Sequence, residues 1–167
     1  MKRFLIITTL FTLAGFQSMA QINRSGGLFL GYSTDINKIG IGVNAEFPIV
    51  EKLSIAPSFF YYFPEKEDGV SLNFLEFNGN ANYYFFQNES MGVYALGGLN
   101  FTRTSVSFEG SNFFGGGFSP SSSNVGLNLG AGANFIVSEK LSPFAEVKYV
   151  ASNFGRLVIF GGVKINF

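Results

Sequence analysis

Residues 125–135 read VGLNLGAGANF, and every second residue of this stretch is apolar. Side chains alternate between the two faces of a β-strand, so Leu127 and Leu129 share one face while Asn128 lies on the other. The even-numbered face holds only Gly and Asn, which are too small and too polar to form a hydrophobic core. We therefore interpret the odd-numbered face as one that contacts lipid.

The same alternation recurs along the chain and predicts a transmembrane β-barrel. We predict eight strands, near 26–33, 39–47, 53–63, 72–86, 91–102, 124–135, 141–150 and 157–167. Odd-numbered positions are apolar in seven of them, and even-numbered positions in the first. Every charged residue inside these predicted strands falls on the polar face: Glu46, Glu76, Glu146, Lys148 and Lys164. A lipid-facing Lys or Arg at mid-depth costs about 2–4 kcal/mol, which explains why the apolar face carries no charge.

Aromatic residues end the predicted strands on the apolar face. Even-numbered strands finish on Phe47, Phe85, Phe135 and Phe167, and odd-numbered strands finish on Tyr32, Phe63, Phe101 and Tyr149. In an antiparallel up-and-down barrel these two sets lie at opposite rims, where aromatic rings favour the membrane interface.

The links between the strands indicate the orientation of the barrel. Three links on one side are short: 48–52, 87–90 and 136–140. The links on the other side include two longer ones, 64–71 and 103–123, and two short ones, 34–38 and 151–156. Short periplasmic turns and longer outer loops are typical of outer-membrane barrels, so we expect both termini in the periplasm. The register of the predicted strand 72–86 stays open, because Phe74-Leu75 and Tyr83-Tyr84-Phe85-Phe86 both leave room for a bulge.

The first twenty residues have the pattern of a secretion signal. Lys2 and Arg3 precede an apolar run over 4–16, and Ser18-Met19-Ala20 is a small-x-small cleavage site. We expect a signal peptide over 1–20 and one barrel domain over 21–167.

Composition excludes several classes of function. Without Lys2 and Arg3 the chain has 9 basic residues against 11 acidic ones, so its net charge of −2 gives no reason to bind nucleic acid. The chain has no Cys and no His, which removes thiolate chemistry and the usual histidine base of nucleophilic hydrolysis. We expect no catalytic site, no cofactor and no metal site.

The chain ends on Val163-Lys164-Ile165-Asn166-Phe167, which alternates strictly up to the last Phe. This pattern resembles the small bacterial outer-membrane β-barrel family, the eight-stranded relatives of OmpX and of the OmpA membrane domain. The resemblance implies that Val163, Ile165 and Phe167 form the signal read by the barrel-assembly machinery. It also implies that outer-membrane lipid surrounds the barrel.

Two groups of residues are candidates for a functional site. Glu46, Glu76, Glu146, Lys148 and Lys164 would lie in a narrow lumen, either as a structural network of ion pairs and amides or as a gate whose pairs can exchange. Phe113, Phe114 and Phe118 in the link 103–123 would form a contact patch outside the cell. Alternatively, the residues of this link extend the flanking strands.

The sequence favours a non-enzymatic outer-membrane protein, whose barrel is an anchor and whose outer loops serve surface interaction or envelope integrity. A narrow gated pore for small solutes is the main alternative. A secreted lipocalin-like barrel that binds a hydrophobic ligand is a further one, but it needs the reverse register, with apolar side chains inside.

Overall fold

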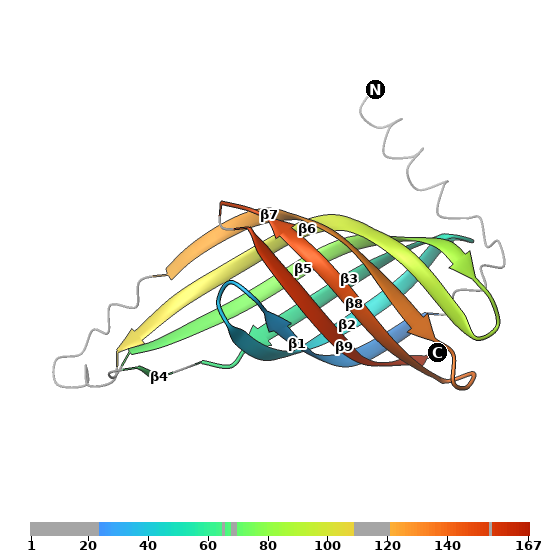
Figure 1. Ribbon diagram of the computed structural model, residues 1–167, viewed down its shortest axis with the longest axis horizontal. Helices are drawn as coiled ribbons and strands as arrows, with labels where there is room; N and C mark the ends of the chain where they lie inside the picture. Colours follow the sequence, from blue (N-terminus) through green and yellow to red (C-terminus); the bar gives the residue numbers. More distant parts are fainter. Residues whose placement is uncertain (1–23, 65, 68–69, 109–120, 154) are drawn as a thin grey trace, which may run out of the picture.

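The computed structural model describes residues 24–64, 66–67, 70–108, 121–153 and 155–167. Its strands follow one another along the chain, and most cross the whole barrel (Figure 1). Their bounds are β1 Ser25–Ser33, β2 Lys38–Val50, β3 Leu53–Tyr62, β4 Lys66–Glu67, β5 Val70–Gln87, β6 Met91–Phe108, β7 Ser121–Phe135, β8 Leu141–Ala151 and β9 Arg156–Asn166.

The strands form one closed antiparallel sheet. The order is β3-β2-β1-β9-β8-β7-β6-β5-β4, and an additional pairing of β3 with β5 closes the barrel. β4 is a two-residue piece that pairs only with Val70 and Ser71 of β5. The remaining strands are the eight predicted ones, so the predicted eight-stranded up-and-down barrel is confirmed.

We name the two ends of the barrel by their connections. The turn end carries the links 51–52, 88–90 and 136–140 together with Phe167, and the loop end carries 34–37, 63–69, 109–120 and 152–155. β6 and β7 run further toward the loop end than the sequence predicted, because their pairing continues to Ser105↔Ser121. The flanks of the link 103–123 therefore extend these strands. Phe113, Phe114 and Phe118 lie outside the described residues.

The uncertain register of the predicted strand 72–86 is resolved by a bulge in β5. The pairing of β5 with β6 shifts between Tyr84 and Phe86. Phe85 and Phe86 are consequently both exposed, although they are adjacent in sequence. Upstream of the bulge, every even-numbered residue from Glu76 to Tyr84 is buried.

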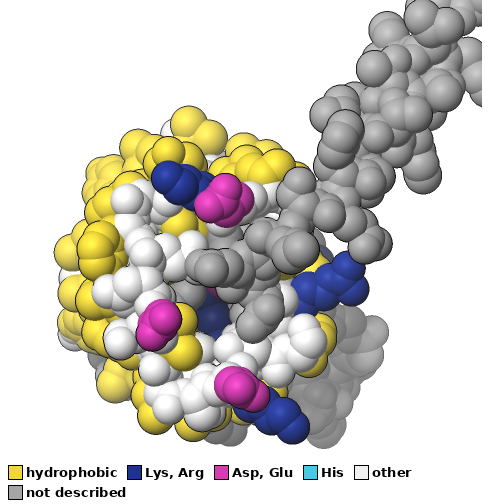
Figure 2. Space-filling view, turned by 90° about the vertical axis from the view of Figure 1, so that its right-hand side faces the viewer, with side chains coloured by type: hydrophobic (Ala, Val, Ile, Leu, Met, Phe, Trp, Pro, Cys, Tyr) yellow, Lys and Arg dark blue, Asp and Glu magenta, His cyan; other side chains and the backbone are white. Residues whose placement is uncertain are grey.

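The outer wall of the barrel is apolar. Leu28, Leu30, Leu99, Leu127 and Leu129 each expose more than half of their surface. The aromatic residues predicted at the two rims are all exposed as well. Seen from the turn end, hydrophobic side chains surround the barrel and charged ones lie over its rim (Figure 2). This register is the opposite of the one that a lipocalin-like barrel needs, so that alternative is excluded. Within the described ranges, no helix is long and apolar enough to cross a membrane.

The interior is divided into two walls of different chemistry. Large apolar side chains come from β1, β3, β8 and β9: Phe29, Phe60, Tyr62, Phe144, Val150, Val158 and Phe160. Buried polar side chains gather on β5, β6 and β7: Glu76, Asn78, Asn80, Asn82, Asn100, Thr102 and Asn128. We call these the aromatic wall and the polar wall.

Glycine makes room for the large rings. A Cβ atom at Gly132 would lie 2.5 Å from Cζ of Tyr94, and one at Gly31 would lie 2.9 Å from Cζ of Phe60. Eight strands enclose a space that side chains can just fill, and small residues opposite rings allow this filling. The sequence predicted this mixture of large and small interior residues.

Candidate functional site

All five predicted interior charges point into the lumen. Glu46, Glu76, Glu146, Lys148 and Lys164 each expose less than a tenth of their surface. Their positions follow from strand alternation, since each is even-numbered and its odd-numbered neighbours face outward. The structure divides them into two clusters and one separate carboxylate.

The turn-end cluster is built around Glu46 of β2. Lys164 of β9 donates from Nζ to Oε2 of Glu46 at 2.6 Å, and Tyr84 of β5 donates to Oε1 at 2.6 Å. Ser54 and Asn82 also donate to Oε1, so four side chains from three other strands hold one carboxylate.

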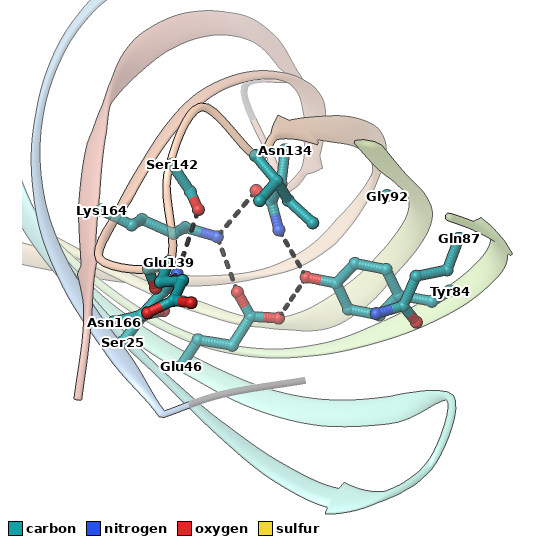
Figure 3. Close-up of a pocket in the computed structure, with 11 residues that line it drawn as sticks. Ser25, Glu46, Tyr84, Gln87, Gly92, Asn134, Glu139, Ser142, Lys164 and Asn166 are labelled. Carbon is teal, nitrogen blue, oxygen red and sulfur yellow. Dashed lines mark hydrogen bonds and ion pairs between the residues drawn. The ribbon is translucent and has the colours of Figure 1, made fainter. Parts of the chain in front are cut away.

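Asn134 of β7 closes the turn-end cluster into a ring. Its amide donates to the hydroxyl of Tyr84 at 2.7 Å and accepts from Nζ of Lys164 at 3.1 Å. Figure 3 shows Glu46, Lys164, Asn134 and Tyr84 pointing toward one another across the barrel. Lys164 also lies over the ring of Phe144, 4.7 Å from its centroid.

A cavity of about 320 Å³, lined mainly by residues with polar side chains, opens above this cluster at the turn end. It is lined by Ser25, Glu46, Tyr84, Gln87, Gly92, Asn134, Ile136, Glu139, Ser142, Lys164 and Asn166. Asn166 donates to Ser142 at 3.2 Å on one side of this cavity. The cluster is thus the floor of the mouth that opens toward the turns.

The loop-half cluster is built around Glu76 of β5, which is fully buried. Lys148 of β8 donates to its Oε1 at 2.6 Å, and Arg156 of β9 donates to its Oε2 at 2.7 Å. Tyr62 of β3 adds a hydrogen bond to Oε2 at 2.9 Å. A buried charge needs such partners, and Glu76 has two cations.

Amide and hydroxyl groups of the polar wall extend the loop-half cluster. Oδ1 of Asn78 accepts from Lys148 at 2.9 Å, from Asn100 at 2.8 Å and from Asn128 at 2.9 Å. Arg156 also donates to the hydroxyl of Thr102 at 2.6 Å. These contacts fix the orientations of the charged groups.

Glu146 of β8 is the predicted charge that the structure does not bring into an ion pair. It accepts a hydrogen bond from Tyr94 at 2.8 Å, and no described cation lies within ion-pair distance. Glu146 thus differs from Glu46 and Glu76, because its partner among the described residues is a neutral phenol and not a cation.

Two interior cations were missed by the sequence analysis, which began strands at 39 and 157 and left Lys38 and Arg156 in links. The structure starts β2 and β9 at these residues, and both are more than nine-tenths buried. Their even numbers match the polar frame of their strands, so extending each strand by one residue would have found them.

The interior is held together by ion pairs and hydrogen bonds between neutral groups. Within the described ranges, no three acidic, His or Cys side chains come together as they would around a metal ion.

The comparison with known proteins agrees with this architecture. The model of the outer membrane protein β-barrel domain family matches residues 7–166. This chain belongs to that family.

Solved structures of similar shape are outer-membrane barrels. The attachment invasion locus protein Ail of Yersinia pestis has a TM-score of 0.61 at 20% identity, covering 87% of this chain and 97% of Ail. Neisserial surface protein A has a TM-score of 0.66 at 17% identity, covering 86% and 96%. The N-terminal barrel domain of Pseudomonas aeruginosa OprF has a TM-score of 0.59 at 17% identity, covering 87% and 98%. No curated protein sequence matches this chain.

Membership of this family identifies the sheet as a barrel of the bacterial outer membrane. The two clusters then lie in its lumen. Tyr62 and Lys148 link the two walls, because Tyr62 packs on Phe60 with ring centroids 4.4 Å apart and Lys148 lies 5.7 Å from the ring centroid of Phe160. Both side chains also bind Glu76, so the lumen is bridged at this level.

Proposed function

We propose that this outer-membrane barrel is a non-enzymatic anchor that presents the sheet at its loop end for contacts outside the cell. The same barrel would contribute to envelope integrity by its presence in the membrane. Three observations support the proposal: the open edge of β7 at the loop end, the pairing of Glu46 and Glu76 with cations in the interior, and the family of the chain.

The open edge of β7 carries the proposal. The pairing of β6 with β7 continues to Ser105↔Ser121, whereas the pairing of β7 with β8 begins only at Leu127↔Ala151. Residues 121–126 therefore have β6 on one side and no described strand on the other. Unpaired N–H and C=O groups at such an edge can pair with an extended segment of a partner. Figure 1 shows β5, β6 and β7 running beyond the other strands at this end.

The orientation follows from the expected processing of the chain. We propose that residues 1–20 are a signal peptide and that both termini of the barrel over 21–167 are periplasmic, which places the loop end outside. The exposure of Val163, Ile165 and Phe167 on the outer wall supports their proposed recognition by the barrel-assembly machinery.

The interior gives no support to a catalytic role. Glu46 and Glu76 are each neutralised by a cation at 2.6 Å, and the chain has no His to act as a base. A carboxylate held in this way is poorly placed to take or release a proton during a reaction. We therefore propose that the protein is not an enzyme.

A sulfated saccharide is a reasonable first probe of the loop end. Ail has been solved in complex with the heparin analogue sucrose octasulfate. Sulfated polysaccharide is therefore one of the immobilised surfaces used in the test.

The test compares bacteria that display the wild-type protein with bacteria that display loop-end variants. Ser123→Lys places a charge at the open edge of β7, and replacing Phe113, Phe114 and Phe118 by Ser removes the candidate contact patch. Ser138→Lys in a turn at the opposite end is the matched control. We expect the loop-end variants to reduce adherence to immobilised polysaccharide, to protein-coated surfaces or to cells, at unchanged amounts of protein in the outer membrane.

Adherence that is absent from the wild type, or that is lost equally in Ser138→Lys, would contradict a contact role of the loop end. In that case, increased detergent sensitivity of cells that lack the protein would leave envelope integrity as its function.

A further inference from the structure

The loop half of the lumen carries more positive than negative charge. Lys38, Lys148 and Arg156 point into it, while Glu76 is the carboxylate that the latter two share. Each of these side chains is more than nine-tenths buried. One carboxylate balances one cation, so this half of the described lumen has an excess of two positive charges.

Two cationic groups in this region have donors to spare. The ammonium group of Lys38 makes no ion pair or hydrogen bond within the described residues, and it lies over the ring of Phe74, 5.7 Å from the centroid. Arg156 uses its Nη2 atom on Glu76 and Thr102, but its buried Nε has no partner in the described part of the chain. A buried donor without an acceptor is costly, and more so when it is charged.

The two groups reach neighbouring positions on β5. Lys38 lies over Phe74, and Arg156 binds Glu76, two residues further along on the same face of that strand. Alternate residues of a strand are about 7 Å apart. An oxyanion that accepts one charge-assisted hydrogen bond of about 2.8 Å from each group spans a similar distance.

We propose that the loop half of the lumen binds a phosphate or sulfate group between Lys38 and Arg156. The anion would accept from the ammonium group of Lys38 and from Nε of Arg156, while Nη2 of Arg156 stays on Glu76. This site lies in the lumen, not at the open edge of β7, and it does not depend on which side of the membrane the loop end faces. It therefore goes beyond the proposed function and can fail independently of it.

Acidic residues of the chain itself compete for this position. Asp35, in the link between β1 and β2, is exposed and accepts a hydrogen bond from Ser33 at 3.0 Å. Glu65 and Asp68 lie outside the described residues, in the link that follows β3, and Glu67 lies in β4. The experiment must therefore separate an external anion from a carboxylate of the chain.

The probe is inorganic phosphate, followed by the broadening of its phosphorus-31 resonance when the purified folded protein is added. We expect Lys38→Met to weaken phosphate binding at least about tenfold, because it removes a charged hydrogen bond. Arg156→Lys keeps the charge but removes the Nε donor, and it should weaken binding to a similar degree. Arg103→Gln is the matched control, because Arg103 is an exposed cation on the outward face of β6.

A second arm uses glucose 6-phosphate as competitor. Competition by glucose 6-phosphate would show that the site admits a phosphate monoester on a saccharide. If glucose 6-phosphate does not compete while phosphate binds, the site takes free anions only. All variants are first checked for folding by their gel mobility before and after heating, so that a loss of binding is not a loss of structure.

Three results would overturn the proposal. The first is that phosphate does not bind, and the second is that Arg103→Gln weakens binding as much as Lys38→Met. The third is that phosphate binds only after Glu65, Glu67 and Asp68 are changed to Gln or Asn, because the site would then be filled by the chain's own carboxylates.

Discussion

Glu76 is the residue through which most of the interior is connected. It lies on β5 and is bound by Tyr62 of β3, Lys148 of β8 and Arg156 of β9. Tyr62 comes from a strand that pairs with β5, whereas Lys148 and Arg156 reach Glu76 across the lumen from strands that the backbone ladder does not join to β5. Glu146 is also buried, but among the residues that the structure describes its hydrogen-bond partner is Tyr94.

This difference predicts unequal effects of two chemically identical substitutions. Glu76→Gln leaves Lys148 and Arg156 buried without a counter-charge, and we expect it to lower the free energy of unfolding by about 3–5 kcal/mol. Glu146→Gln keeps an acceptor for Tyr94 and strands no paired cation, so we expect a loss of about 1 kcal/mol or less. Urea titration of the protein folded in lipid vesicles measures both. Equal losses in the free energy of unfolding would show that the ion pairs of Glu76 do not stabilise the barrel more than the hydrogen bond of Glu146 does.

At the scale of the strands, glycines that face the interior let aromatic rings of neighbouring strands pack close to the backbone. Gly42 of β2 faces Phe29 of β1, and a Cβ atom there would also lie 2.6 Å from the carbonyl oxygen of Phe59. Gly79 of β5 lies on the outward face, and a Cβ atom there would meet nothing within 4 Å. The first glycine is required by packing inside the barrel, whereas the second is not.

We therefore expect Gly42→Ala to destabilise the barrel by about 1–3 kcal/mol, as overpacking of a filled interior does. Gly79→Ala should be neutral or slightly stabilising, because it restricts the unfolded chain without a clash. The same urea titration in vesicles compares them. A loss of stability in Gly79→Ala of the size seen in Gly42→Ala would contradict the assignment of the two faces.

The alternation of residues was enough to predict the strands and their faces, because side-chain direction in a strand depends only on position. It placed Glu46 and Lys164 inside, and it named two possible sites for a bulge, of which the structure has the one within Tyr83 to Phe86 and keeps regular pairing at Phe74 and Leu75. It could not pair the charges, because contacts across the lumen depend on the stagger of strands that are far apart in sequence. The pairing of Lys148 with Glu76 and the isolation of Glu146 therefore became visible only in the structure.

At the scale of the whole molecule, the two walls meet and fill the lumen. Phe29 lies 5.3 Å from Phe60 and 4.8 Å from Phe160 between ring centroids, so rings of β1, β3 and β9 form one continuous layer. Glu76 ties this layer to the polar wall through Tyr62 and Lys148. Exchange of one ion pair would leave the rings in place, which favours an anchor over a pore that is gated by charge alone.

Single-channel recording in a planar bilayer tests this conclusion. We expect neither the folded wild-type barrel nor the Glu76→Gln variant to produce current steps, because both keep every ring of the aromatic wall. The double substitution Phe29→Ala and Phe160→Ala deletes two adjacent rings, and we expect it to admit water and small ions and to produce current steps. Wild-type steps that change in size or frequency in Glu76→Gln would instead establish the narrow gated pore, with the loop-half cluster as its gate.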